Sequence, residues 1–214
     1  MEELELINQY YIDHGPIVVG GRSTISPLDG DGMYPATFVL RPLGARLLCQ
    51  QIARGYKRLR DFGELGHCLA PMPLVYTSVG ALDDLAAVAR VCKQYREQID
   101  SLLQQGAEVS GYKVVVGFAG AFASTYTLWY EWRPGRWQFV PRCGGEELGG
   151  LWLFKNRDHA IGTAKREARR LGRKAYVFEA RAYASDRVNR CDDPDVVELV
   201  RLEEQVASFS PEEV

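Results

Sequence analysis

Residues 151–184 read LWLFKNRDHAIGTAKREARRLGRKAYVFEARAYA. Strands are predicted at Leu151–Phe154 and Lys174–Ala184, because both runs are rich in aromatic and branched apolar residues. Between them, Asn156 is a candidate N-cap and Gly172 a helix stop, and mostly small apolar side chains recur at helical spacing (Ala160, Ile161, Ala164, Ala168, Leu171). The stretch therefore predicts a strand–helix–strand unit whose helix lies close to a sheet.

The predicted helix also lies in the most basic part of the chain. Eight Lys or Arg residues lie between Lys155 and Lys174, against Asp158 and Glu167. Helical spacing puts five cations in one band opposite the alanines: Lys165, Arg166, Arg169, Arg170 and Arg173. Such a band favours salt-dependent phosphate binding, and a merely solvated helix face is the alternative. No helix-turn-helix, zinc-finger or RNA-recognition consensus accompanies it.

Length and composition indicate a globular chain. The 214 residues, 46% hydrophobic and 25% charged, suit a single domain over 1–214, with sub-units 1–110 and 111–214 as an internal division. No apolar run reaches the roughly 18 residues of a membrane helix. The acidic start MEELE lacks a signal-peptide pattern, so we expect a cytoplasmic protein without a membrane partner.

Charge is distributed unevenly along the chain. Residues 1–35 carry six acids and one base, residues 191–214 carry eight acids and one base, and residues 36–190 carry 24 bases and 14 acids. The basic middle either binds a polyanion or is neutralised by the acidic ends, within one molecule or across a homo-oligomer. We weigh both alternatives.

Periodicity predicts an α+β fold, with a mixed or largely antiparallel sheet and packed helices. Expected helices span 2–12, 45–60 and about 78–105, with another after Asp193–Pro194. Expected strands span 17–19, 36–40, 74–77, 112–118, 124–132 and 137–140, the last two flanking a hairpin turn at 133–136. The order strand–helix–strand over 74–118 echoes that of 151–184, which is either a weak internal duplication or a coincidence of ordinary units.

Two further surfaces are candidate binding sites. The expected helix 45–60 would present a second set of cations, including Arg54, Lys57 and Arg58. The expected hairpin combines aromatic and guanidinium groups, among them Trp129, Trp132, Arg133 and Arg136, which can stack on nucleobases and neutralise phosphates. Core packing or an oligomer contact is the alternative for these aromatics.

Catalytic and metal signatures are missing from the sequence. The five cysteines are scattered without a C-x-x-C pair, which favours buried reduced thiols over zinc ligands or disulfides. The three histidines form no known catalytic pattern, and the glycine-rich segment 143–150 lacks the ending of a P-loop. The catalytic residues are therefore unknown, and we expect no metal or cofactor.

One faint resemblance supplies an alternative. The segment GLWLF at 150–154, a helix containing Ala160, and YVFE at 176–179 are similar to the strand–helix–strand of ADP-ribosyltransferase-like folds. The loose candidates for the diagnostic positions are Arg22-Ser23-Thr24 and Glu147, and their spacing does not establish the pattern. The resemblance implies a nucleotide-using transferase with its site at the glycine-rich segment, near Glu146 and Glu147.

The sequence thus favours a non-enzymatic binding protein whose basic helical surface engages nucleic acid or an acidic protein partner. The alternatives are the nucleotide-using transferase and a structural oligomer subunit. The first hypothesis requires that the acidic ends leave the basic helix exposed.

Overall fold

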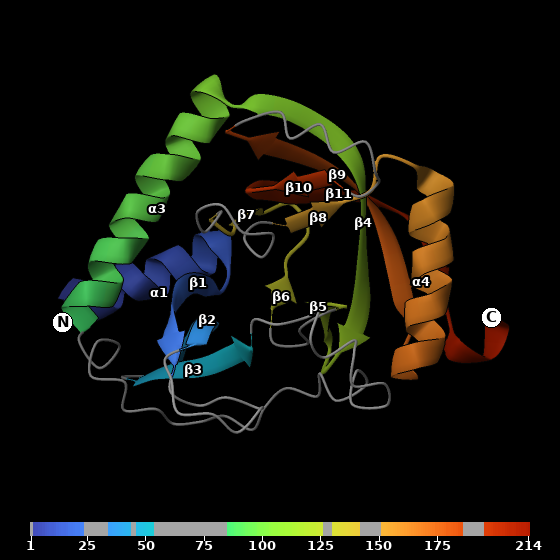
Figure 1. Cartoon of the computed structure of the whole chain (residues 1–214), viewed down its shortest axis with the longest axis horizontal. Coiled ribbons are helices and arrows are strands. Elements are labelled where there is room, and N and C mark those ends of the chain that lie inside the picture. Colours follow the sequence, from blue (N-terminus) through green and yellow to red (C-terminus); the bar gives the residue numbers. More distant parts are fainter. Residues whose placement is uncertain are drawn as a thin grey trace.

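The computed structural model describes residues 2–23, 34–43, 46–53, 85–125, 130–141, 151–185 and 195–214. These residues form three α-helices and largely antiparallel sheets, which confirms the expected α+β class. The helices are α1 (Glu2–His14), α3 (Leu85–Gln105) and α4 (Arg157–Leu171). In Figure 1, α1 and α3 lie together at the left of the view and α4 lies at the right.

The main sheet has six antiparallel strands in the order β6-β5-β4-β9-β11-β7. Their bounds are β4 Ala107–Phe118, β5 Ala121–Ser124, β6 Glu131–Trp132, β7 Trp137–Phe139, β9 Ala175–Ala184 and β11 Leu199–Phe209. The two edge strands, β6 and β7, follow one another in the chain across residues 133–136. A connection this short requires the edges to lie close together, so the sheet curls round on itself.

The side chain of Gln138 joins these two edges. Its amide nitrogen donates to the Glu131 carbonyl at 2.7 Å, and its amide oxygen accepts from the Arg133 backbone N–H at 2.7 Å. Gln138 is fully buried. One glutamine therefore supplies hydrogen bonds that a direct β6–β7 ladder would have made.

Two smaller sheets complete the described structure. Strands β1 (Ile17–Ser23), β2 (Tyr34–Leu43) and β3 (Arg46–Ala53) form an antiparallel sheet in chain order. Strand β8 (Leu151–Leu153) pairs with β10 (Asp195–Val197), and Phe154 makes an isolated bridge to Tyr112 of β4. Gly111 permits that bridge, because a Cβ there would lie 2.4 Å from the Phe154 carbonyl oxygen. A 3₁₀ turn, η2 (Pro211–Glu213), ends the chain.

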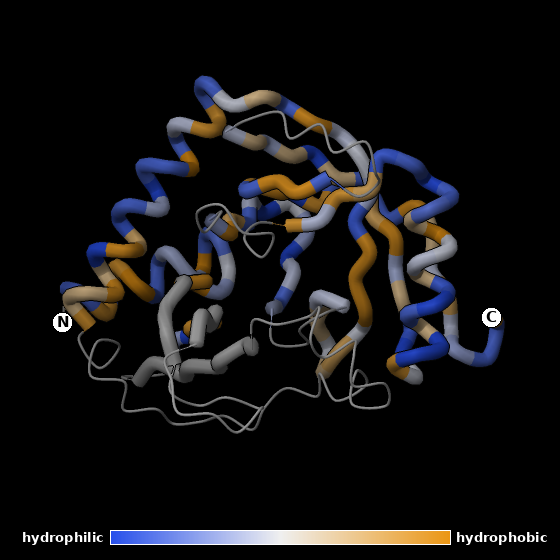
Figure 2. The backbone as a smooth tube through the Cα atoms, viewed as in Figure 1, coloured by the Kyte–Doolittle hydropathy of each residue, from blue (hydrophilic) through white to orange (hydrophobic). Residues whose placement is uncertain are grey.

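The main sheet has a buried core on each face. Its inner face contributes Val115, Phe178, Ala180, Val200 and Leu202 to one cluster. Its outer face is covered by α4 over one part and by α1 and α3 over another. Figure 2 shows the corresponding hydropathy, with hydrophobic colour along β4 and hydrophilic colour on the outward turns of α4.

The expected helix at 45–60 is wrong over its described part. Residues 46–53 form β3, which pairs with residues 36–43 of β2. The sequence pattern misled because Leu48 and Ile52 lie four residues apart, which places them on one face of a helix and equally on one face of a strand. Neighbouring β2 supplies the hydrogen-bond partner that decides between the two.

The expected C-terminal helix is also wrong. Residues 195–197 and 199–209 are the strands β10 and β11 instead. Along β11, Val200 and Leu202 belong to the inner core while Leu199 belongs to the outer one, so the period is two. The β-branched Val residues of this segment favour strands over a helix.

The expected hairpin around 133–136 is corrected in its pairing. The turn forms, with the Arg136 N–H donating to the Arg133 carbonyl at 3.2 Å. However, β6 pairs with β5, and β7 pairs with β11. The single strand expected at 124–132 is likewise wrong, because β5 ends at Ser124 and β6 begins at Glu131, antiparallel to it.

The expected strands at 17–19, 36–40 and 112–118 are present within β1, β2 and β4, and the helix expected to end at Gln105 does so. The strand expected at 74–77, the start of that helix before residue 85 and the glycine-rich segment 143–150 lie outside the described residues. The suggested duplication therefore stays a prediction.

Candidate functional site

Local sequence defines both ends of α4. The Asn156 side-chain oxygen accepts from the backbone N–H of Asp158 at 2.7 Å and of His159 at 3.3 Å, so the predicted N-cap is confirmed. Gly172 ends the helix with φ of +59°, a left-handed conformation that glycine adopts without strain. These caps satisfy backbone groups that the helix leaves unpaired at its two ends.

The buried face of α4 consists mostly of small side chains and contains one acid. Ala160, Ala164 and Ala168 are fully buried against β4 and β9, which lets the helix approach the sheet closely. Glu167 is 6% exposed and pairs with Arg170, whose guanidinium also donates to the Thr125 carbonyl at 2.9 Å. Arg170 is therefore engaged in holding the helix in place rather than free for a ligand.

The opposite side carries the cations, and we call it the α4 cationic face (Lys165, Arg166, Arg169 and Arg173). All four residues are exposed. The Lys165 ammonium lies 5.3 Å from the centroid of the Phe209 ring, and the Arg173 guanidinium lies 4.7 Å from that of Phe118. Arg166 makes a looser contact with Glu167 at 3.5 Å. Four of the five cations of the expected band are therefore exposed, and the charged groups of three of them also contact neighbouring side chains.

The described acidic residues of the N-terminal segment lie away from this face. Helix α1, with Glu2, Glu3 and Glu5 in its first turn, packs on α3, on the other side of the molecule from α4 (Figure 1). The C-terminal segment enters the sheet as β11. Its turn η2 contacts α4, but in the described structure no carboxylate of residues 199–214 forms an ion pair with the α4 cationic face.

Of the other predicted binding residues, those that the structure describes do not join this face. Trp132 is 2% exposed and belongs to the inner core, where it contacts Tyr130 at a ring-centroid distance of 5.3 Å. It therefore cannot offer a stacking surface. Arg136 is exposed in the turn after β6. Four predicted residues lie outside the described parts of the chain: Arg54, Lys57, Arg58 and Trp129.

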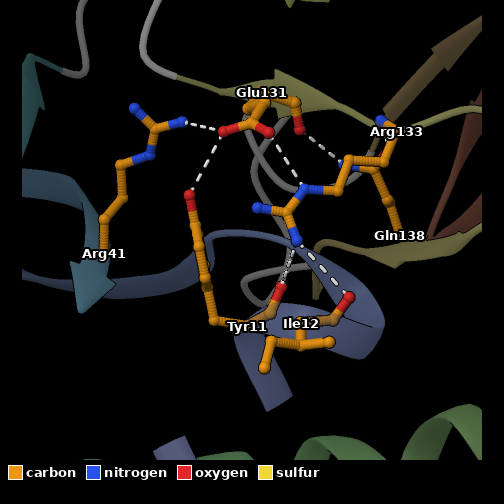
Figure 3. A network of polar contacts seen from close by, with 6 residues as sticks. All are labelled: Tyr11, Ile12, Arg41, Glu131, Arg133 and Gln138. Atoms are coloured by element: carbon orange, nitrogen blue, oxygen red, sulfur yellow. Dashed lines mark hydrogen bonds and ion pairs between the residues drawn. The ribbon is translucent and has the colours of Figure 1, made fainter. Parts of the chain in front are cut away.

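Arg133 belongs to a polar network centred on Glu131, which the sequence did not indicate (Figure 3). The Glu131 carboxylate accepts from Arg133 at 2.9 Å and from the Tyr11 hydroxyl at 3.2 Å, and it pairs with Arg41 of β2. Arg133 also donates to the carbonyls of Tyr11 and Ile12 near the end of α1, at 2.9 and 3.4 Å. The network joins α1 and β2 to the edge of the main sheet.

The charges around Glu131 hold it in its ionised form. Partial burial would raise the pKa of this carboxyl, but the hydrogen bond and charge of Arg133, the charge of Arg41 and the hydrogen bond from Tyr11 together lower it below its usual value. Each of these partners is itself anchored in a different element. The arrangement fits a structural joint better than a proton-transfer site.

Lys113 of β4 is the second group that sequence reasoning missed. It is 8% exposed and lies on the same face of β4 as Val115, inside the curled sheet. Its ammonium nitrogen donates to the Trp152 carbonyl at 2.8 Å and lies 4.9 Å from the centroid of the Trp132 ring. The alternation in KVVV at 113–116 was the available signal, because it places Lys113 with Val115 and opposite Val114 and Val116.

The remaining groups offer little chemistry. Burial raises the pKa of the Cys92 thiol to about 12, so this cysteine is an inert core residue, as expected for the cysteines in general. Within the described residues, no cluster of three His, Cys, Asp or Glu side chains is placed to hold a metal ion. In the same residues, no helix combines the length and apolarity of a membrane span.

Comparisons of this chain with protein-family models, with curated proteins and with solved structures found no match. The α4 cationic face, the Glu131 network and Lys113 are therefore interpreted from their own geometry. Of the three, only the first presents several charged groups to solvent.

Proposed function

We propose that this protein is a non-enzymatic binding protein that engages nucleic acid through the α4 cationic face. The observation that supports this most directly is the exposure of Lys165, Arg169 and Arg173 on one side of a rigidly capped helix. Acidic groups at the N-terminal end of the chain lie on the other side of the molecule. The face can therefore act as a local positive field for a polyanion.

The geometry favours contacts with phosphates rather than with bases. At 1.5 Å of rise per residue, Lys165 and Arg169 are separated by about 6 Å along the helix axis, and Arg173 follows the Gly172 cap. That length corresponds to about two phosphate steps of one strand, at about 3.4 Å each along the axis. The exposed side of α4 carries no Asn or Gln to read base edges. Binding is expected to be independent of sequence.

The test compares two double variants with equal loss of charge. Lys165→Gln with Arg169→Gln removes two members of the α4 cationic face, and Arg90→Gln with Lys93→Gln removes two exposed cations from α3. Affinity for a fluorescent oligonucleotide is measured by anisotropy at several salt concentrations. For two lost phosphate contacts the slope of log affinity against log salt should fall by roughly 1.4 to 1.8 in the first variant. The second should keep the wild-type slope.

Arg170 is deliberately kept in this design. Replacing it would remove the closer of the two ion-pair partners of the buried Glu167 carboxylate, so any lost binding could reflect a displaced helix. Circular dichroism of both double variants checks that helix content is retained. Wild-type protein that does not bind at low salt, or an equal loss in both variants, would contradict the proposal.

The same assay separates the other expected partner. An acidic protein surface would use the same cations, so poly-glutamate is tested as a competitor. Binding to poly-glutamate with none to the oligonucleotide would replace nucleic acid by a protein partner. The transferase alternative depends on Glu146 and Glu147, which lie outside the described residues, and stabilisation by NAD in a thermal-shift assay would support it. A structural oligomer would show a multiple of the monomer mass in light scattering.

A further inference from the structure

The interior of the curled sheet holds a lysine that has no acidic partner among the described residues. Lys113 is 8% exposed, and its surroundings on the inner face are apolar and aromatic, including Val115, Leu153 and Trp132. Lysine is almost never buried to this degree unless it is paired with a carboxylate. Among the described residues, none forms an ion pair with Lys113.

Only part of the hydrogen-bonding capacity of this amine is used. Its nitrogen donates to one acceptor, the Trp152 carbonyl at 2.8 Å. The adjacent Trp132 indole N–H is buried and has no hydrogen-bond partner in the described structure. Two polar groups with unmet hydrogen-bonding capacity therefore meet in one apolar region, where each costs folding free energy.

Burial also changes the state of the amine. Desolvation lowers the pKa of Lys113 to about 7, so about half of the molecules carry a neutral amine at neutral pH. An exposed lysine with a pKa near 10.4 is neutral in fewer than about one molecule in a thousand at this pH. A neutral amine is a nucleophile, and a desolvated lysine is a recognised way of producing one.

We propose that Lys113 is an imine-forming site for small uncharged aldehydes. The nitrogen lone pair attacks the carbonyl carbon to give a carbinolamine, which loses water to leave a C=N bond. One amine and one aldehyde thus give one imine and one water, without any oxidant or reductant. The apolar walls favour an uncharged aldehyde over an oxoacid, whose carboxylate would lose its hydration there.

The experiment traps the imine in the folded protein. Native protein at pH 7 is treated with acetaldehyde and cyanoborohydride, which reduces the imine to an ethylamine, and ethylation of each lysine is followed by peptide mass spectrometry. Lys93, exposed on α3, serves as the internal reference. Because the neutral amine fraction differs so strongly, we expect Lys113 to be ethylated at least tenfold faster than Lys93, even with restricted access.

Two controls make the result decisive. In urea the rates of Lys113 and Lys93 should become equal, because unfolding restores the ordinary amine. Lys113→Met should lose the fast-labelled peptide and leave labelling of Lys93 unchanged. Native labelling of Lys113 that is equal to or slower than that of Lys93 would overturn the proposal. Fast labelling that persists in urea would overturn it as well, because the fold would then not be responsible.

Discussion

Replacement of Lys113 by methionine is expected to stabilise the fold at neutral pH. The two side chains have similar length, but methionine needs no hydration and fits irregular apolar space. Burial lowers the pKa of Lys113 from 10.5 to about 7. Because one pKa unit corresponds to about 1.4 kcal/mol, this difference costs the folded state about 4 to 5 kcal/mol around pH 7.

Two favourable contacts offset part of that cost. Methionine removes the hydrogen bond to the Trp152 carbonyl, worth about 1 kcal/mol, and the contact with the Trp132 ring, worth about 1 kcal/mol more. The net expectation for Lys113→Met is a gain of about 2 to 3 kcal/mol in unfolding free energy at pH 7. A single stabilising substitution of this size would mark Lys113 as a residue kept for a purpose other than stability.

The pH dependence has a definite sign. Between about pH 7 and pH 10.5 the unfolded state binds more protons at this position than the folded state, so wild-type stability rises with pH, by at most about 1.4 kcal/mol per unit. Below about pH 7 both states are protonated and the contribution is constant. Lys113→Met lacks this component, so its advantage should shrink by about 2 kcal/mol between pH 7 and pH 9.

Urea unfolding of both proteins at pH 7, 8 and 9, followed by tryptophan fluorescence, measures this difference. Groups that titrate in both proteins, such as Cys92, cancel in the comparison. If the two pH profiles are parallel, or if methionine is destabilising at every pH, then Lys113 does not carry the buried, shifted amine inferred from the structure. Lys113→Arg provides a contrast, since arginine keeps its charge and should be destabilising throughout the range.

Two further predictions concern the joint at the edge of the main sheet. Glu131→Gln should lower the unfolding free energy by about 2 kcal/mol at pH 7, because it weakens charged hydrogen bonds to Arg41 and Arg133. Since the pKa of Glu131 is lowered in the folded state, the stability that its carboxylate adds is present above about pH 4.5 and is lost as pH falls through the folded-state pKa. The acid denaturation curves of wild type and variant should therefore converge. Curves that stay separated would contradict this. Gln138→Met should lower the unfolding free energy in urea by about 3 kcal/mol, because it leaves two backbone groups unpaired where β6 and β7 meet. Gln205→Met, on the exposed part of β11, should cost little. Equal costs for the two variants would argue against the hydrogen-bonded bridge that Gln138 forms between β6 and β7.

The parts of this fold that sequence predicted well are those whose determinants lie within a few residues. Helix α4 is an example, since Asn156, the alanine stripe and Gly172 act within one element. The exposed positions of Lys165 and Arg169 follow from the same period. The resulting candidate surface was therefore visible in advance, and the structure adds that the N-terminal acids lie elsewhere.

The failures share a physical cause, which is that the deciding partner is distant in sequence. The segment 199–209 has spacings compatible with a helix, and it is a strand because β9 and β7 flank it. The same applies to charge: Arg170 looks equivalent to Arg169 in the sequence, yet its contacts with Glu167 and the Thr125 carbonyl make it part of the helix anchor.

For Lys113, the local sequence pattern predicts the face of the strand but not the burial of that face. Alternation assigns it to the face of Val115, but only the closure of β6 toward β7 and the covering strand β8 make that face an interior. A lysine on an open sheet would be solvated and ordinary. The same residue inside a closed sheet has a lowered pKa and a nucleophilic amine. Its chemistry is thus a property of the closure, and disrupting the Gln138 bridge should return Lys113 toward the reactivity of an exposed lysine, as Lys93 defines it.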